Sequence, residues 1–438
     1  MFEKEEEKLR DYKTSYDQLN IPENRLEEAI LAGFQKAKLE NKPKPRKRKW
    51  LISLAAAAIV FISFFTSIRL SPAFADYIAV IPGMEKLVEI IRNDKGKLLA
   101  IENDYYEELG ISQEKNGLTF TLDGVIADED ALVLFYSLQS EQKQSEMVVE
   151  EVRLKGTDED INIGSFSYGR PLSSKDGKSF GNDMMEYSFQ APLTAREFEL
   201  KVKVKGDNQT EEYTLPFQLK KEIKKKKTYV LNKSVTIEGQ KITFVDAKVY
   251  PLRVAVHVKL DPNNTKKLLN FDDLRLVDEN GEVWNKIADG VTASHISENE
   301  KILYLQSNYF RDPEELYLVL NKIQAVDREK ASILVDIQAE KILSQPEGNL
   351  FSDVVVEGKY IMLKMRIDEE FHYHPFSDVR DKDGNLLDSP ETSISGPYDG
   401  MIEFGINIPE LQAEMNPISL ELSFFPAWIE GNGKVRIK

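Results

Sequence analysis

The histidines are the first side chains to test for chemistry, because the chain has 4 of them and no cysteine. One stretch, EEFHYH at residues 369–374, has a spacing that could hold a metal ion. On a strand, His372 and His374 would share a face with Glu370, and a histidine pair at i, i+2 can bind zinc. No third ligand is evident, and neither is a partner that would orient the two rings. We therefore predict surface or half-buried histidines and no metal site.

Other signatures of catalysis are missing as well. The sequence contains no glycine-rich phosphate loop, no HExxH zinc motif and no GxSxG nucleophile elbow. Its 74 acidic residues would supply an acid–base pair anywhere, so they single out none. The lack of cysteine excludes disulfides, thiolate metal sites and thiol nucleophiles. We expect no enzyme activity, no catalytic residue and no cofactor.

Length and charge narrow the class of protein further. The 438 residues are enough for two to four domains of roughly 100–200 residues each. A formal net charge of −16 argues against general nucleic-acid binding, which needs a basic face. Domains of this size can form large cores without disulfides, even in an exported protein. This combination fits a Gram-positive cell envelope better than a eukaryotic secretory pathway.

An uncharged apolar run, WLISLAAAAIVFISFFTSI, begins at Trp50. As a helix it would be roughly 28 Å long, close to the hydrocarbon thickness of a bilayer. Only Arg69 follows the run closely, whereas a group of cations directly precedes it: Lys42, Lys44, Arg46, Lys47, Arg48 and Lys49. Because basic residues stay cytoplasmic, we predict a transmembrane helix at residues 50–69 with the N-terminus inside and the C-terminal region outside. A buried core helix is the alternative.

A signal-peptidase site is a sharper alternative to a retained anchor. The sequence SPAFAD follows the apolar run, and Ala73 and Ala75 have the small-x-small spacing of such sites. The 49 residues before the run are long for a signal peptide and have helical features of their own. We therefore predict a retained anchor, with Ala73 and Ala75 as a conditional cleavage site.

The segment at residues 1–49 carries a helix with an unpartnered apolar stripe. Asn20 and Asn24 are potential N-caps, each with a glutamate three residues later. The stripe that follows has helical spacing: Leu26, Ala29, Ile30, Gly33, Phe34 and Ala37. A helix this short cannot bury the stripe alone, so we expect Leu26, Ile30 and Phe34 to bind a cytoplasmic partner protein. A two-helix hairpin and the membrane surface are the alternatives.

Beyond the predicted span, residues 70–111 indicate a juxtamembrane helical segment. Met84, Leu87, Val88 and Ile91 have amphipathic helical spacing, and Pro82-Gly83 breaks the chain before them. Such a helix would lie on the outer leaflet or pack on the first of the domains that follow.

From residue 112 onward the apolar residues alternate, which is typical of strands. Similar stretches follow Gly117, Gly239 and Gly358, spaced by 122 and 119 residues. This spacing predicts three β-sandwich domains at residues 112–224, 225–344 and 345–438. The fold class is thus mainly β, with one transmembrane helix and a short α-helical cytoplasmic segment. We interpret the stretch KKEIKKKKTY at residues 220–229 as a solvated linker; contact with anionic polymers or lipid headgroups is the alternative.

Two parts of the chain resemble known families. The strings NIPENRLEEAILAGFQKAK and RLSPAFADYIAVIPGMEKLVEIIRNDKG, with the basic tether and apolar run between them, resemble a Firmicutes domain of unknown function of the 4179 type. This resemblance covers about residues 20–140. Residues from about 225 to 340 resemble the Ig-like 5643-type domain that often accompanies it.

The first resemblance implies a membrane-bound protein similar to anti-sigma factors. Such a protein would hold a sigma factor at the membrane and release it on an outside signal. The resemblance brings no catalytic residue. A surface adhesion or cell-wall-binding protein with a signal anchor is the rival interpretation, and an exported hydrolase is a third.

Overall fold

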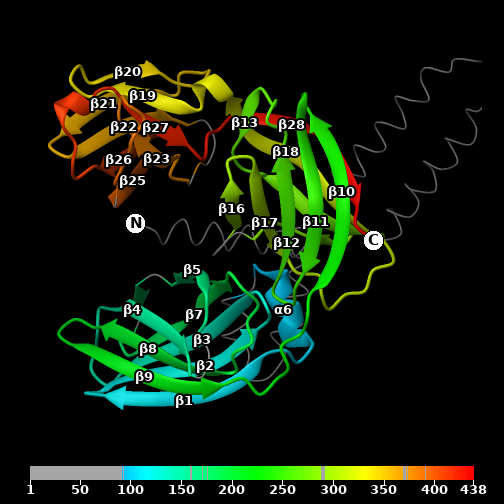
Figure 1. Ribbon diagram of the computed structural model, residues 1–438. Helices are drawn as coiled ribbons and strands as arrows, with labels where there is room; N and C mark the ends of the chain where they lie inside the picture. Colours follow the sequence, from blue (N-terminus) through cyan, green and yellow to red (C-terminus); the bar gives the residue numbers. More distant parts are fainter. Residues whose placement is uncertain are drawn as a thin grey trace, which may run out of the picture. The chain divides into compact units, whose positions relative to one another are not determined.

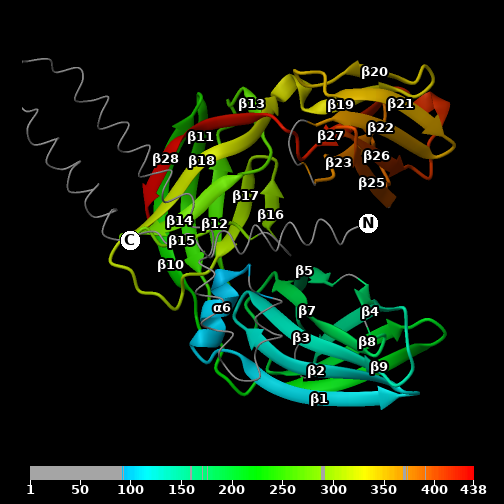
Figure 2. The same cartoon turned by 180° about the vertical axis from the view of Figure 1, so that it is seen from behind.

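The computed structural model describes residues 91–438 apart from residues 92, 158, 159, 170, 175, 288–291, 368–370, 372 and 390. These residues are mainly β, as expected, and form six antiparallel sheets and one α-helix (Figures 1 and 2). No helix within this part of the chain is both long and apolar enough to cross a membrane. The cytoplasmic segment predicted at residues 1–49 and the span predicted at residues 50–69 lie outside the described residues.

Helix α6 (Lys95–Glu102) precedes the first strand. Asp94 is its N-cap: the carboxylate accepts a hydrogen bond from the backbone N–H of Lys97 at 3.1 Å. All residues from Gly96 to Ile101 are buried. The helix is therefore covered on all sides. The amphipathic helix predicted from Met84 to Ile91 concerns the residues just before it. Of the residues that carried that prediction only Ile91 is described, and it is 1 % exposed.

The first β unit consists of two sheets that enclose one core. Its first sheet has the order β1-β2-β3-β7-β5: β1 Glu107–Lys115, β2 Leu118–Ala127, β3 Ala131–Ser140, β7 Ser179–Phe189 and β5 Ile163–Tyr168. Its second sheet has the order β6-β4-β8-β9: β6 Leu172–Ser173, β4 Glu146–Gly156, β8 Glu197–Lys205 and β9 Thr210–Gln218. Alternating burial in β8 and β9 places one face of the second sheet on the core and the other in solvent.

The second β unit repeats this plan. Its first sheet has the order β10-β11-β12-β17-β16: β10 Lys227–Ile237, β11 Gln240–Val249, β12 Arg253–Leu260, β17 Glu300–Gln306 and β16 Ala293–Ser297. Its second sheet has the order β13-β18-β14-β15: β13 Lys266–Leu268, β18 Leu316–Asp327, β14 Asp273–Asp278 and β15 Val283–Trp284. The turns Asn116-Gly117 and Glu238-Gly239 connect the first two strands of the first and second units, respectively. All four residues have positive φ, as type I′ hairpin turns require.

The third β unit is smaller. One sheet has the order β20-β19-β27-β23-β24: β20 Lys341–Ser344, β19 Ser332–Asp336, β27 Ile418–Leu422, β23 Phe376–Arg380 and β24 Leu386–Leu387. The other has the order β21-β22-β26-β25: β21 Phe351–Glu357, β22 Tyr360–Arg366, β26 Met401–Asn407 and β25 Glu391–Tyr398. Two 3₁₀ turns, η1 Arg328–Lys330 and η2 Ala413–Met415, belong to its connections.

The last strand, β28 (Trp428–Arg436), returns to the second β unit. It pairs with β18 in antiparallel register from Tyr317 opposite Arg436 to Gln324 opposite Trp428. Ile429 and Val435 of β28 enter the second core. Our domain prediction gave residues 345–438 to one C-terminal domain, whereas the structure places β28 in the sheet of the domain before it. The third β unit is thus inserted between two neighbouring strands of the second.

Candidate functional site: a buried polar joint between two β units

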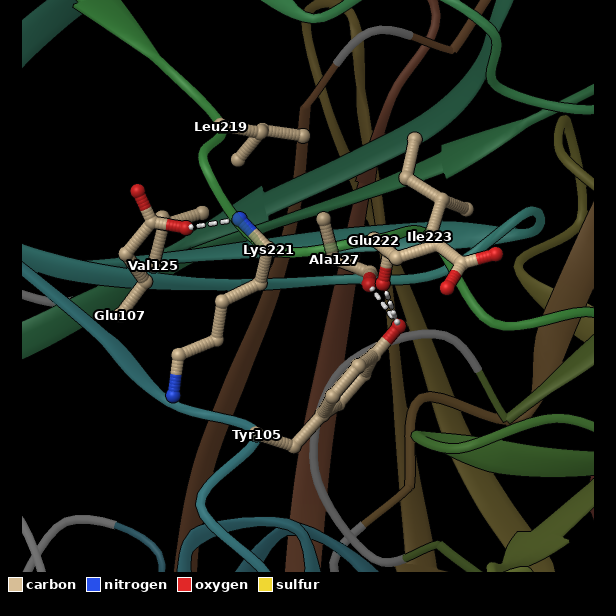
Figure 3. A pocket seen from close by; sticks show the side chains of 8 residues that line it. All are labelled: Tyr105, Glu107, Val125, Ala127, Leu219, Lys221, Glu222 and Ile223. Atoms are coloured by element: carbon tan, nitrogen blue, oxygen red, sulfur yellow. Dashed lines mark hydrogen bonds between the residues drawn. The ribbon is translucent and has the colours of Figure 1, made fainter.

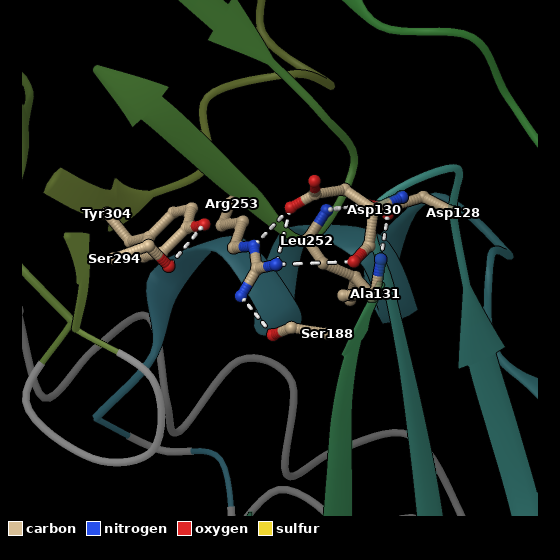
Figure 4. Close-up of polar contacts among 8 residues, drawn as sticks. All are labelled: Asp128, Asp130, Ala131, Ser188, Leu252, Arg253, Ser294 and Tyr304. Carbon is tan, nitrogen blue, oxygen red and sulfur yellow. Dashed lines mark hydrogen bonds and ion pairs between the residues drawn. The ribbon is translucent and has the colours of Figure 1, made fainter. Parts of the chain in front are cut away.

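A guanidinium from the second β unit lies among oxygens of the first. Arg253, the first residue of β12, is 1 % exposed. Its Nη2 lies 2.5 Å from Asp130 Oδ2, its Nε donates to the same oxygen at 2.6 Å, and its Nη1 donates to Ser188 Oγ at 2.7 Å (Figure 4). The ring of Tyr304 covers the guanidinium, with 4.1 Å between the ring centroid and Cζ. We call this contact and its neighbours the joint.

Asp128, in the turn between β2 and β3, is the second fixed group of the joint. Its side chain is fully buried. Oδ1 accepts the backbone N–H groups of Asp130 and Ala131, both at 2.8 Å, and Oδ2 accepts that of Leu252 at 2.9 Å (Figure 4). Burial, and next the nearby charge of Asp130, raise the pKa of the Asp128 carboxyl to about 7. The turn between β2 and β3 therefore binds the backbone of the second β unit.

Helix α6 is held by both β units at the joint. Lys97 Nζ lies 2.8 Å from Glu186 Oε2 on β7 and 3.1 Å from Asp94 Oδ2. Burial alone would lower the pKa of Lys97, but the two carboxylates outweigh it and raise the pKa. On the other side, Gly96 is so close to the second β unit that a Cβ atom there would lie 2.5 Å from the backbone nitrogen of Ser307. The helix therefore cannot shift without breaking contacts to both units.

Two regions of the chain match protein families, and residues of the joint lie in both regions. Residues 44–140 match a domain of unknown function, DUF4179, and residues 226–346 match a family of unknown function, DUF5643. The two matches follow one another in the predicted order. Asp128 and Asp130 lie in the DUF4179 match, and Arg253 lies in the DUF5643 match. The contacts of Asp128 and Asp130 with Leu252 and Arg253 therefore connect the two matched regions, whereas Ser188 and Glu186 lie outside both matches.

Comparison with individual proteins adds little. No curated protein matches the chain. Among solved structures, the crystal structure of the conserved domain protein from Bacillus anthracis is similar, with 15% sequence identity and a TM-score of 0.36. The similarity covers 55% of this chain and 84% of that chain. At this TM-score the similarity supports no argument about fold or function.

The backbone of the lysine-rich stretch at residues 220–229 is hydrogen-bonded to the first β unit. The Glu107 carboxylate accepts the N–H groups of Lys220 and Lys221, each at 2.9 Å. Figure 3 shows the bond from Lys221. The Tyr105 hydroxyl donates to Ala127 O at 2.7 Å and accepts the N–H of Lys224 at 3.0 Å. Tyr105, Glu107, Ala127 and Lys221 are among the residues that line a pocket here (Figure 3). Most residues of this stretch are exposed, as expected, but its backbone is hydrogen-bonded to the first β unit.

Several lysine side chains of this stretch contact aromatic rings. Lys224 Nζ lies 5.8 Å from the ring centroid of Tyr105, and Lys227 Nζ lies 4.7 Å from that of Tyr309. Lys226 Nζ pairs with the Glu129 carboxylate at 3.0 Å. Cation–π contacts and one ion pair therefore fix the direction in which the chain leaves the first β unit.

The site residues predicted from sequence lie elsewhere. Leu26, Ile30 and Phe34, expected to bind a partner, and Ala73 and Ala75, expected at a cleavage site, all fall outside the described residues. Of the EEFHYH stretch, His374 is described and its Nδ1 lies 3.4 Å from Phe376 O, whereas His372 and Glu370 are not. Within the described ranges the structure has no group of three metal-ligating side chains.

Sequence reasoning missed the joint because the distant hydrogen-bond partners of Arg253, Asp128 and Lys97 are 65 to 124 residues away in the chain. The sequence of each β unit nevertheless contains a feature that indicates a buried charge. Arg253 stands at the start of an otherwise apolar run, and Asp128, Glu129 and Asp130 form a turn between two apolar strands. Buried charges are nearly always paired, so such an arginine indicates an unseen carboxylate. Nothing local indicated which one.

Proposed function

We propose that this chain is a single-pass membrane signalling protein of the anti-sigma-factor type. Its residues 1–49 would bind a cytoplasmic sigma factor through Leu26, Ile30 and Phe34. Residues 50–69 would cross the membrane, and the β units would act outside as tandem Ig-like domains that sense an envelope signal. The uncharged run from Trp50 and the cations on one side of it support this topology.

The joint is the structural observation that carries the sensing half of the proposal. Helix α6 is the described helix nearest to the predicted span in the sequence, and it is held by Glu186 of the first β unit and by close packing on Ser307 of the second. A signal that moves one β unit against the other would have to disturb Lys97, Arg253 or Asp128. Each is a buried polar group held by several partners, and leaving such a group without its partners is costly. The joint is therefore suited to convert a change in domain contact into a change at the juxtamembrane chain.

Release of the partner would follow cleavage after Ala75. The small residues Ala73 and Ala75 lie between the predicted span and helix α6 in the sequence, so a displaced helix could expose them to a peptidase. We expect Ala75→Tyr to leave partner binding intact and to abolish the response. A normal response in this variant would show that SPAFAD is only the chain leaving the bilayer.

Topology is the first experiment. A reporter active only outside the cytoplasm should work when fused after Lys438, and a reporter active only inside should work when fused before Trp50. The opposite pattern would overturn the whole proposal, including its rival as a surface adhesion or wall-binding protein.

Partner capture is the second experiment. In the full-length protein, Phe34→Asp should abolish co-purification of a sigma factor and raise sigma-dependent transcription without a stimulus. Three buried anchors of this kind contribute roughly 1.5–3 kcal/mol each, enough that removing one weakens binding strongly. Gln35→Asp, next to the stripe but on another face, is the matched control and should change neither. If Phe34→Asp, like the control, changes neither co-purification nor transcription, the surface-adhesion interpretation is favoured.

A further inference from the structure

A lysine, an asparagine and an aspartate form a chain of contacts at one end of the second β unit. Lys286 follows β15, whereas Asn270 and Asp272 lie on either side of Phe271, between β13 and β14. Lys286 Nζ donates to Asn270 Oδ1 at 2.5 Å, and Asn270 Nδ2 donates to Asp272 Oδ1 at 2.6 Å. An amine therefore touches a carboxamide whose nitrogen is hydrogen-bonded to a carboxylate.

The carboxylate is held in this orientation by two strands of the second sheet. Trp428 Nε1, at the start of β28, donates to Asp272 Oδ2 at 2.6 Å. Gln324 Nε2, on β18, donates to both oxygens of Asp272 at 3.3 and 3.2 Å. These donors keep Oδ1 at the carboxamide nitrogen, where a proton would be needed for that nitrogen to leave as ammonia.

The surroundings favour a neutral amine at Lys286. Burial lowers the pKa of Lys286, opposed by the nearby charge of Asp272. Lys301, which is 5 % exposed and donates to Leu268 O at 3.2 Å, adds a second positive charge to the same region. The pKa of Lys301 is itself lowered to about 8, first by burial and then by Lys267 and Lys286. A neutral lysine amine is the nucleophilic form.

We propose that Lys286 and Asn270 form an intramolecular isopeptide bond, with Asp272 as the catalytic carboxylate. The neutral Nζ attacks Cγ of Asn270, and the carbonyl electron pair moves onto Oδ1. Asp272 takes the proton that the new amide nitrogen loses and gives it to Nδ2. The Cγ–Nδ2 bond then breaks, ammonia leaves, and the electron pair on Oδ1 restores the carbonyl. An amine and a primary amide become a secondary amide and ammonia, so the reaction needs no oxidant or cofactor.

Such a bond would join the two sheets of the second β unit. Asn270 precedes β14 of one sheet, whereas Lys286 forms a β-bridge with Leu305 on β17 of the other. Disulfides are excluded as covalent ties in this chain because it has no cysteine. A cross-link here would give an exposed β domain the resistance to unfolding that disulfides give other extracellular domains.

Mass spectrometry of the purified full-length chain tests the proposal. The intact protein should be about 17 Da lighter than its sequence, the mass of one ammonia. Trypsin should give a branched peptide that joins residues 268–275 to residues 276–301, uncut at Lys286. A succinimide at Asn280-Gly281 would also lose one ammonia, but it would leave the two peptides separate and Lys286 cleavable.

Variants assign the roles. Lys286→Met and Asp272→Asn should both restore the full mass and abolish the branched peptide, and circular dichroism would establish that they are folded. Lys266→Met, which removes a lysine of β13 paired to Asp327, is the matched control and should keep the cross-link. The proposal is overturned if the unchanged chain has its full mass, or if the loss of ammonia persists in Lys286→Met. If Asp272→Asn still forms the branched peptide, Asp272 is not the catalytic carboxylate.

Discussion

Arg253 shows how a single buried charge can hold two β units together. Its guanidinium contacts Asp130 and Ser188 of the first unit and the ring of Tyr304 in its own. A buried ion pair often adds little net stability compared with apolar packing, but removing one partner leaves the other charge unpaired in a poorly solvated site. Separation of the two β units would leave buried charges unpaired. Arg253 therefore opposes that separation more strongly than the attraction between Arg253 and Asp130 alone implies.

We expect Arg253→Met to lower the free energy of unfolding of the second β unit by about 3–5 kcal/mol, because Asp130 loses its buried partner. Tryptophan fluorescence in a guanidinium titration measures this, since Trp284 and Trp428 both lie in the second unit. Trypsin should also cut faster within residues 220–227 once the joint opens.

Arg153→Met is the matched control for that experiment. Its side chain is 73 % exposed and pairs with Glu151, which is 53 % exposed. Substitutions at such surface sites usually change stability by less than about 0.5 kcal/mol. Equal effects of the two substitutions would mean that Arg253 does not anchor the joint.

Asp128 makes the stability of the folded chain depend on pH. Its pKa is about 7 in the folded state against an ordinary value of 3.8, so the folded state keeps its proton where the unfolded state has lost it. Stability contributed by this group is complete below pH 3.8 and falls as the pH rises towards 7. The difference in unfolding free energy between the unchanged chain and Asp128→Asn should therefore decrease over this range, by at most about 1.4 kcal/mol per pH unit, and level off above it.

Asp207→Asn provides the opposite case. Hydrogen bonds from Ser145 lower the pKa of this exposed carboxyl, so its contribution is lost only as the pH falls below the ordinary range. Urea unfolding from pH 4 to pH 8 distinguishes the two. A difference for Asp128→Asn that does not change between pH 4 and pH 7 would contradict the raised pKa.

At the scale of the element, β28 is a strand that belongs to a domain begun 200 residues earlier in the chain. It supplies the partner that β18 needs along Tyr317–Gln324, as β9 does for β8 in the first unit. An unpaired β18 would expose backbone groups and the core residues behind them. The chain therefore returns from the third β unit to the second because β28 is needed to pair with the free edge of β18.

Removing residues 428–438 should therefore unfold the second β unit and leave the third largely intact. Hydrogen exchange should show lost protection in β10, β11, β12 and β18, because Ile429 and Val435 leave their core. Removing residues 437 and 438 alone is the control and should preserve protection. Loss of protection confined to the third unit would contradict the observed strand pairing.

At the scale of the molecule, the third β unit is an insertion whose two ends lie side by side. Gln324 pairs with Trp428, and the N–H of Ala325 donates to Ala427 O at 2.9 Å. Insertions tolerated in this way leave the host domain with a complete core of its own. The second core indeed draws its buried residues from residues 231–325 together with residues 429–435.

We expect the second β unit to stay folded when residues 328–426 are replaced by a short glycine-rich turn. The contacts given up include the ion pair between Lys267 and Glu421 at 3.4 Å and the packing of Leu269 on the third core. Circular dichroism and the fluorescence of Trp284 measure the outcome. Loss of cooperative unfolding in this variant would show that the third unit supports the core of the second.

Several conclusions required only the sequence. Alternating apolar residues and repeated glycine turns at Gly117 and Gly239 predicted mainly β structure and its recurrence, because strand periodicity and hairpin turns are encoded by neighbouring residues. The family resemblance was likewise confirmed in the predicted order. The span at residues 50–69 and the stripe at Leu26, Ile30 and Phe34 stay predictions from local pattern.

Only the tertiary structure showed which distant residues meet. Arg253 with Asp130, Lys97 with Glu186, and Lys286 with Asn270 are each separated by too many residues for periodicity to pair them. The return of β28 was hidden for the same reason, since a strand's sequence specifies which of its faces is buried but not which edge it joins. Burial then determined the chemistry: the same carboxyl that is an ordinary acid in a solvated turn has a pKa near 7 when Asp128 is enclosed between two β units.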